Sequence, residues 1–226
     1  IFFKGEKVNF KSPHDAIAKG IGMVHQHLML APELTDAENM VLGTEPLKGR
    51  ILLDTEKAEQ LTREVSKEYG LDVPIRAKIE DLPLGIRQRV EILKALFRNA
   101  ELLILDEPTS VLTPQETDIL FKTLRHLKEQ GKTILFISHK LSEVKRIADR
   151  VTVMRDAKVI STEDARELSE RDIAYLMVGR NITYEQVPQP EKVGGPFLEA
   201  RNIGFTDDQG IEVLKNINFE VRAGEI

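Results

Sequence analysis

The sequence of 226 residues contains no cysteine and no tryptophan, which excludes disulfides, thiolate metal sites and thiol nucleophiles. Its apolar runs are only a few residues long, far short of the roughly 20 residues that a bilayer-spanning helix needs. No basic-then-apolar leader opens the chain. We therefore expect any role at a membrane to come through a partner.

The chain also lacks a basic excess, since its formal net charge is −5. Proteins that coat nucleic acid usually carry a basic face, so we expect no nucleic-acid partner. An acidic balance does not exclude ATP, because phosphate sites rely on local backbone amides and a metal ion. With 41% apolar residues, the chain can bury a core in one large domain or in one and a half.

Two adjacent carboxylates, Asp106 and Glu107, follow the aliphatic run Leu102-Leu103-Ile104-Leu105. Such a run predicts a strand buried on both faces of a parallel sheet, and these sheets bind ligands beyond the carboxyl ends of their strands. Neighbours in a strand point to opposite sides, so one carboxylate can reach a Mg²⁺ shell while the other faces an attacking water. Taken alone, such a pair is more often a solvated turn or a helix cap.

A second aliphatic strand at Thr133–Ile137 ends just before Ser138-His139-Lys140. The segment between the strands has helical spacing, with Pro114 at its start and Gly131 just past its end. A right-handed crossover makes the two strands parallel, so His139 is expected at the same sheet edge as the two acids. A lone histidine there would be read as a surface residue, and the neighbouring carboxylates reverse that reading.

A glycine-containing turn, Leu82-Pro83-Leu84-Gly85-Ile86, runs into an amphipathic helix that extends to residue 97. Gly85 lets a phosphate approach backbone N–H groups at the positive end of a helix dipole. On spacing alone, a loop glycine before a core helix is the favoured interpretation.

Other local signals predict further elements. Asp54 is expected to cap a helix that runs through Tyr69 and is stopped by Gly70. We expect a turn at Asp156-Ala157. Two strands are expected at 197–203 and 211–221.

Five motifs occur in the order in which ATP-binding cassette (ABC) ATPases carry them, and the chain resembles that family. They are a Q-loop at 23–27, a signature at 82–86 followed by Gln88-Arg89-Val90, a Walker B strand at 102–107, a D-loop at 110–113 and a switch histidine at His139. The resemblance implies an α/β fold of the P-loop NTPase (RecA-like) type with a helical subdomain, and ATP and Mg²⁺ as cofactors.

Flanking segments narrow the resemblance to the tandem ATPases of bacterial importers for simple sugars and nucleosides. They are 38–43, 112–116 and 176–180, while 89–96 together with 113–116 favours the nucleoside branch. The resemblance implies transmembrane permease subunits and a second ABC domain of the same chain as partners, and indirectly an extracellular substrate-binding protein. It also implies a peripheral place on the cytoplasmic face of the membrane.

The resemblance assigns roles to particular residues. Asp106 would hold Mg²⁺ through water, Glu107 would polarise the attacking water, and His139 would contact the γ-phosphate. Gln26 would sense Mg²⁺, although a polar loop residue is an equally good interpretation of it. Residues that would touch nucleotide are Leu82, Pro83, Leu84, Gly85, Ile86 and Ser110.

The signature departs from the family pattern at two positions, where Pro83 replaces the usual serine and Leu84 replaces the usual first glycine. Proline has neither a hydroxyl nor an N–H to donate. Because the signature serves ATP held by the opposite domain, the departure concerns that opposite site. The D-loop carries Thr113 where many members have aspartate, so we assign that segment no catalytic role.

We expect three parts along the chain: a first ABC domain at 1–180 with a helical subdomain at about 27–99, a proline-rich linker at 181–196, and the first strands of a second ABC domain at 197–226. No G-x-x-x-x-G-K-[ST] motif occurs. By resemblance the two P-loops would lie before Ile1 and after Ile226, so the first domain is expected to be truncated and this chain alone to be inactive.

Two other functions compete with the importer. A non-transport ABC ATPase associated with ribosomes or DNA would have a basic, helical linker, whereas 181–196 is short and proline-rich. A regulatory module that binds nucleotide without hydrolysing it is compatible with Pro83. The presence of Asp106, Glu107 and His139 disfavours that module.

Overall fold

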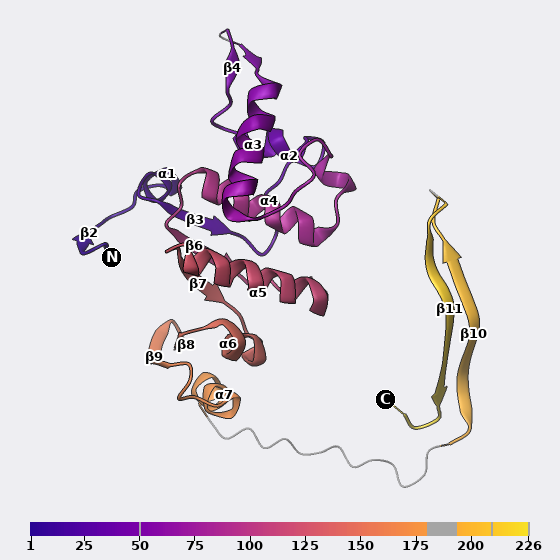
Figure 1. The fold of residues 1–226 in the computed structure, drawn as a ribbon. Coiled ribbons are helices and arrows are strands. Elements are labelled where there is room, and N and C mark those ends of the chain that lie inside the picture. Colours follow the sequence, from indigo (N-terminus) through magenta and orange to yellow (C-terminus); the bar gives the residue numbers. More distant parts are fainter. Residues whose placement is uncertain (50, 180–193, 209, 226) are drawn as a thin grey trace. The chain divides into compact units, whose positions relative to one another are not determined.

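The computed structural model describes residues 1–49, 51–179, 194–208 and 210–225, drawn in colour in Figure 1. The chain divides into two compact units, Ile1–Arg180 and Asn181–Ile226. The predicted linker at 181–196 lies outside the described residues except for its last three positions. The first unit ends at the residue where the first ABC domain was expected to end. The identity of the second unit stays a prediction.

A parallel three-stranded sheet organises the first unit. Its strands are β3 (Ile21–Val24), β6 (Leu102–Asp106) and β7 (Thr133–Ile137), in the order β3-β6-β7. Helix α5 (Pro114–Glu129) makes the crossover from β6 to β7 and begins with a capping box between Thr113 and Glu116. The strand, helix and strand predicted here are confirmed to within one residue.

The sheet buries one face, and the prediction of burial on both faces is wrong. Val24, Leu103 and Leu105 are buried in the main core with apolar residues of α4 and α5. On the other face, Met23 is 40% exposed and Leu135 is 51% exposed. The aliphatic run indicated a strand correctly, but a run alone does not say whether a second layer covers that strand. Within the described residues of the first unit, the second face of the sheet stays partly exposed.

The helical subdomain contains three α-helices, a short 3₁₀ helix and a small hairpin. They are α2 (Asp36–Val41), β4 (Leu47–Lys48), β5 (Leu52–Leu53), α3 (Thr55–Tyr69), η1 (Ile79–Asp81) and α4 (Leu84–Phe97). Asp54 caps α3, and Gly70 ends it in the left-handed conformation with φ 64°, both as predicted. The hairpin was not predicted, because two-residue strands carry no recognisable period.

One side chain of this subdomain is buried without partners. Asp36, the first residue of α2, is fully buried, and neither of its carboxylate oxygens has a hydrogen-bond partner among the described residues. Burial raises the pKa of Asp36 to about 7. The subdomain therefore contains an acid whose charged form is poorly tolerated.

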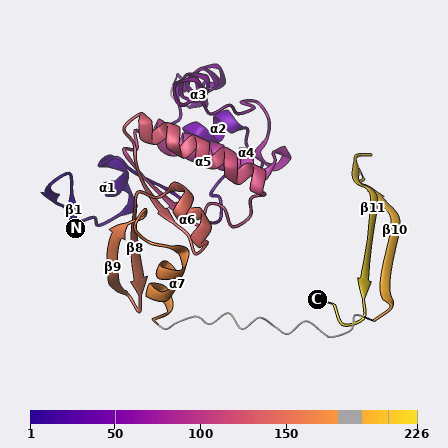
Figure 2. The same cartoon turned by 60° about the horizontal axis from the view of Figure 1, so that its bottom comes forward.

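The rest of the first unit flanks the sheet. It comprises β1 (Phe2–Phe3), β2 (Glu6–Lys7), α1 (Pro13–Ala18), α6 (Leu141–Ile147), β8 (Arg150–Arg155), β9 (Lys158–Asp164) and α7 (Glu170–Val178). Figure 2 shows β8, β9 and α7 together below the sheet. The turn at Asp156 and Ala157 was predicted and has positive φ at both residues, but β9 after it was missed.

The second unit is an antiparallel hairpin of β10 (Pro196–Thr206) and β11 (Glu212–Arg222). Both strands were predicted, the first as a shorter stretch at 197–203 and the second one residue early at 211–221. Nearly all of their side chains are exposed, and Ala200 is the buried exception among those described.

Candidate active site

The candidate site lies where the parallel strands end. Asp106 is the last residue of β6 and pairs in register with Ile137, the last residue of β7. The backbone N–H of Glu107 donates to the carbonyl of Ile137 at 3.0 Å, which ties the residue after β6 to the end of β7. Because both strands are parallel, the loops that follow them emerge at one edge.

Glu107 does not continue the alternation of the strand. Its φ is +44°, a left-handed value that costs an L-residue with a side chain about 1 to 2 kcal/mol. The strand ends at Asp106, so the alternation that was expected to place Asp106 and Glu107 on opposite sides does not extend to Glu107. The backbone turn, rather than the pleat of the strand, aims the Glu107 side chain.

The Glu107 carboxylate brings together three of the predicted residues. Gln26 Nε2 donates to Glu107 Oε2 at 3.3 Å, and His139 Nδ1 lies 3.0 Å from Glu107 Oε1. Gln26 follows β3 by two residues, so the three side chains come from loops after three adjacent strands. Glu107 is 29% exposed at its side chain and His139 is 62% exposed, which leaves the group open to a ligand from solvent.

The oxygen atoms at this edge suit a hard divalent cation. Asp106 is half-buried, and Glu107 adds a second carboxylate beside the Gln26 amide. Carboxylate and amide oxygens with open positions for water and phosphate are what Mg²⁺ prefers. Within the described ranges, no group of three or more acidic or histidine side chains forms a preassembled metal cage.

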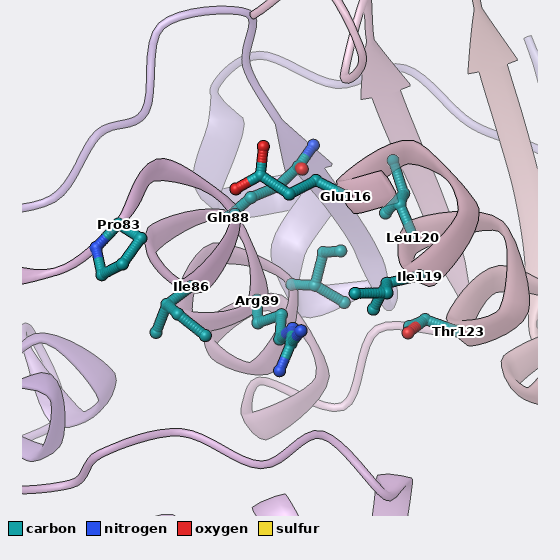
Figure 3. Close-up of a pocket in the computed structure, with 10 residues that line it drawn as sticks. Pro83, Ile86, Gln88, Arg89, Glu116, Ile119, Leu120 and Thr123 are labelled. Atoms are coloured by element: carbon teal, nitrogen blue, oxygen red, sulfur yellow. The ribbon is translucent and has the colours of Figure 1, made fainter. Parts of the chain in front are cut away.

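The signature segment occupies the start of α4. Leu82 is buried, and Pro83 stands at the N-cap without any side-chain hydrogen bond. A cavity of about 210 Å³ lies between α4 and α5, and Pro83, Gly85 and Ile86 line its α4 side (Figure 3). Ser110, in the D-loop, is exposed.

Glycine at position 85 is favoured by a close approach to the Glu116 side chain and not by its backbone angles. A Cβ at this position would lie 2.7 Å from Glu116 Oε1. The backbone N–H and hydroxyl of Thr113 hold the pKa of Glu116 below its usual range, and the backbone of Gly85 adds to this effect. Figure 3 shows Glu116 reaching from the start of α5 toward α4. The favoured interpretation from spacing, a glycine packed before a core helix, is consistent with this contact.

Sequence reasoning missed a group of buried polar residues behind the acid pair. Gln88 of α4 donates from Nε2 to the carbonyl of Pro108 at 2.6 Å. The hydroxyl of Thr109 donates to Glu143 Oε2 at 2.5 Å. A signal was present at Glu143, a charged residue one turn beyond His139 in a short helix, but its partner lies 34 positions away.

Comparison with known proteins gives consistent matches. Residues 1–110 match the family model described as "ABC transporter". A glucose import ATP-binding protein of Haloferax volcanii is 43% identical over all of this chain and 46% of its own length. A guanosine import ATP-binding protein of Bacillus subtilis is 45% identical over 99% of this chain and 44% of its own length. The chain thus spans about half the length of the curated relatives that it matches.

Solved structures share the fold. A nucleotide-free ATP-binding cassette from an ABC transporter superimposes with a TM-score of 0.64 at 24% identity, over 78% of this chain and 72% of its own. The ADP conformation of another ATP-binding cassette gives a TM-score of 0.62 at 25% identity, with the same two coverages. The fold is therefore the α/β fold of these cassettes.

Proposed function

We infer that the chain belongs to the ABC transporter family of ATP-binding proteins, and on that premise we propose that it forms part of the ATP-hydrolysing subunit of an importer for nucleosides or simple sugars. The names of its relatives support both substrate classes: glucose import, guanosine import, and nucleoside import in Lactococcus lactis. The nucleoside branch remains our preferred class from the segments at 89–96 and 113–116.

The observation that supports hydrolysis is that Gln26 and His139 both contact the Glu107 carboxylate. Phosphoryl transfer needs positioning and charge neutralisation more than covalent chemistry. We assign Glu107 to orient and polarise the attacking water, and His139 to donate to the γ-phosphate. Gln26 connects this edge to the helical subdomain, because the chain enters that subdomain directly after it.

Asp106 and Gln26 would hold a magnesium ion through water. A bound Mg²⁺ supplies charge neutralisation on the phosphates. Asp106 suits this task because it ends β6 at the ligand-binding edge and is half-buried. Its neighbour Glu107 already contacts Gln26 and His139. We therefore assign magnesium binding to Asp106 and activation of water to Glu107.

The signature residues Leu82, Pro83, Leu84, Gly85 and Ile86, with Ser110, would serve nucleotide held by the second ABC domain. Pro83 offers no hydroxyl there, and its N-cap position makes no side-chain hydrogen bond. A hydrogen bond to a charged acceptor contributes roughly 1.5 to 3 kcal/mol. We therefore expect the opposite site to turn over more slowly than the site around Glu107.

The importer needs membrane subunits, and the helical subdomain is our candidate for contact with them. No helix among the described residues is long and apolar enough to cross a membrane. Attachment through permease subunits on the cytoplasmic face would place the protein at the membrane without a span of its own.

The test is Glu107→Gln in the whole protein that carries this chain. The amide keeps the shape and loses the base, so turnover should fall by about 10² to 10⁴ while nucleotide binding persists. Glu129→Gln, at an exposed glutamate near the end of α5, is the matched control and should change neither quantity. Turnover within a factor of three of the parent in Glu107→Gln would remove the assignment.

A further inference from the structure

The turn that follows Glu107 is held from two directions. Gln88 of α4 donates to the carbonyl of Pro108 at 2.6 Å. From the other direction, Thr109 donates its hydroxyl to Glu143 at 2.5 Å, and Lys140 Nζ donates to the Thr109 carbonyl at 2.9 Å. We call these four side chains, Gln88, Thr109, Lys140 and Glu143, the clasp.

Three of the four side chains of the clasp are largely shielded from water. Gln88 is 5% exposed, Thr109 1% and Glu143 7%. Hydrogen bonds in such surroundings are stronger than at the surface, and leaving one unmade costs more. The clasp therefore holds the turn with little freedom to slide.

Glu143 is the centre of the clasp. Besides the Thr109 hydroxyl, its carboxylate accepts from the Ser138 hydroxyl at 3.4 Å and lies 3.3 Å from Lys140 Nζ. It stands in the first turn of α6, where the helix dipole also favours a negative charge. One carboxylate thus fixes both residues that flank His139.

The clasp connects three segments with different tasks in the proposed function. Gln88 belongs to the helix that starts at the signature, Thr109 lies two residues after Glu107, and Lys140 adjoins His139. The Glu107 and His139 side chains also contact each other at 3.0 Å. A shift of α4 would pull the Pro108 carbonyl and alter that contact.

We propose that Gln88 and Glu143 are positioning residues that couple the signature helix to the Glu107–His139 pair through the Pro108–Thr109 turn. The proposal rests on the proposed function for its catalytic consequence, but its mechanical part concerns this chain alone. Neither residue touches the reacting atoms. Nucleotide docking at the signature of one site would then adjust the hydrolytic residues of the other.

Hydrogen exchange on this chain tests the mechanical part. The Glu107 amide bonds to the Ile137 carbonyl and the Lys140 amide to Ser138 Oγ, so both report on the turn and its neighbour. Gln88→Met keeps the volume and removes the donor. We expect the Glu107 and Lys140 amides to exchange at least tenfold faster in this variant, with the amides of α3 unchanged. Exchange within twofold of the parent at both amides would overturn the proposal.

A double variant separates coupling from independent damage. Glu143→Gln keeps an acceptor for Thr109 and removes the charge that pairs with Lys140. If both residues act through one turn, Gln88→Met combined with Glu143→Gln should accelerate exchange less than the product of the two single effects. A product that holds within a factor of two at both amides would show independent sites and contradict the coupling.

In the whole protein, Gln88→Met should lower kcat at least tenfold and leave KM within threefold, because positioning and not nucleotide binding is changed. Asp118→Asn is the control, since it removes an exposed ion pair between α5 and Arg146 of α6 without touching the clasp. A proportional loss in both variants would indicate only structural damage. If the parent protein itself hydrolyses no ATP, the proposed function is wrong. The hydrogen-exchange measurement would then still show whether Gln88 and Glu143 are coupled through the Pro108–Thr109 turn.

Discussion

Two acids stand in the first turns of two short helices, one in the helical subdomain and one beside the sheet edge, and their surroundings are opposite. Asp36 begins α2, is fully buried and has no partner for either oxygen among the described residues. Glu143, in α6, is nearly as buried but lies next to Thr109, Ser138 and Lys140. Burial alone therefore does not tell whether an acid stabilises a protein; the donors around it do.

The largest effect is expected from Asp36→Asn at pH 8. Burial raises the pKa of Asp36 from 3.8 to about 7, so folding favours the protonated acid, which corresponds to about 4 kcal/mol once the carboxylate is ionised. The contribution of Asp36 to the free energy of unfolding should be largest below about pH 4 and should be lost as the pH rises to about 7. Asp36→Asn should remove this pH dependence and gain up to that amount at pH 8, measured by urea unfolding. A parent stability that stays flat between pH 4 and 8 would contradict the raised pKa.

Glu143→Leu should have the opposite sign. It leaves the Thr109 hydroxyl and the Lys140 ammonium without their acceptor, and removing one partner of a buried ion pair costs about 3 to 5 kcal/mol. Lys140 is 39% exposed at its side chain, so water can partly replace the carboxylate, and we expect the lower end, about 3 kcal/mol. Urea unfolding at pH 7 measures the loss. A variant as stable as the parent would show that the donors around Glu143 do not stabilise the protein, and the contrast with Asp36 would then be wrong.

Thr109→Val removes one hydrogen-bond donor to Glu143 and keeps the Glu143 carboxylate itself. Valine has a similar shape, and Glu143 retains Ser138 and Lys140. We expect a loss of about 1.5 to 3 kcal/mol in the free energy of unfolding, as for one buried hydrogen bond to a charged group, and toward the lower end because Glu143 keeps two other partners. A loss as large as that of Glu143→Leu would mean that Thr109 alone determines the stability of the clasp.

Asp118→Asn sets the lower end of the scale. Asp118 pairs with Arg146 at 2.5 Å, but both side chains are about half exposed. Exposed pairs contribute about 0.2 to 1 kcal/mol. The unfolding midpoint in urea should therefore shift only slightly, and added salt should reduce the difference. A loss above 2 kcal/mol would show that exposure is a poor guide in this molecule.

The sequence was most informative where a local signal defined an element. Pro114 and Gly131 bounded α5, and Asp54 and Gly70 bounded α3, because caps act within one turn of the helix. Parallel strands then placed His139 beside Glu107, since the edge of such a sheet collects the loops that follow its strands.

The sequence was least informative where the cause lies far along the chain. The contact from Gln88 to Pro108 spans 20 positions and that from Thr109 to Glu143 spans 34, so no local pattern announces them. Whether a second layer covers β6 depends on other segments in the same way. Asp36 carries no signal of its own, because an acid at a helix start normally faces water.

The left-handed backbone at Glu107 has a consequence for genetic selection. Glycine adopts φ of +44° without strain, so Glu107→Gly relaxes the main chain more than any other exchange at this position. In a library sorted only for folded protein, that variant should be enriched over alanine and glutamine at the same codon. In a library of the whole protein sorted for the import activity that we propose, it should disappear with them. The ratio of the frequencies of Glu107→Gly in the two libraries would separate the effect of backbone strain on folding from the effect of the lost side chain on activity. The measurement needs no purified protein.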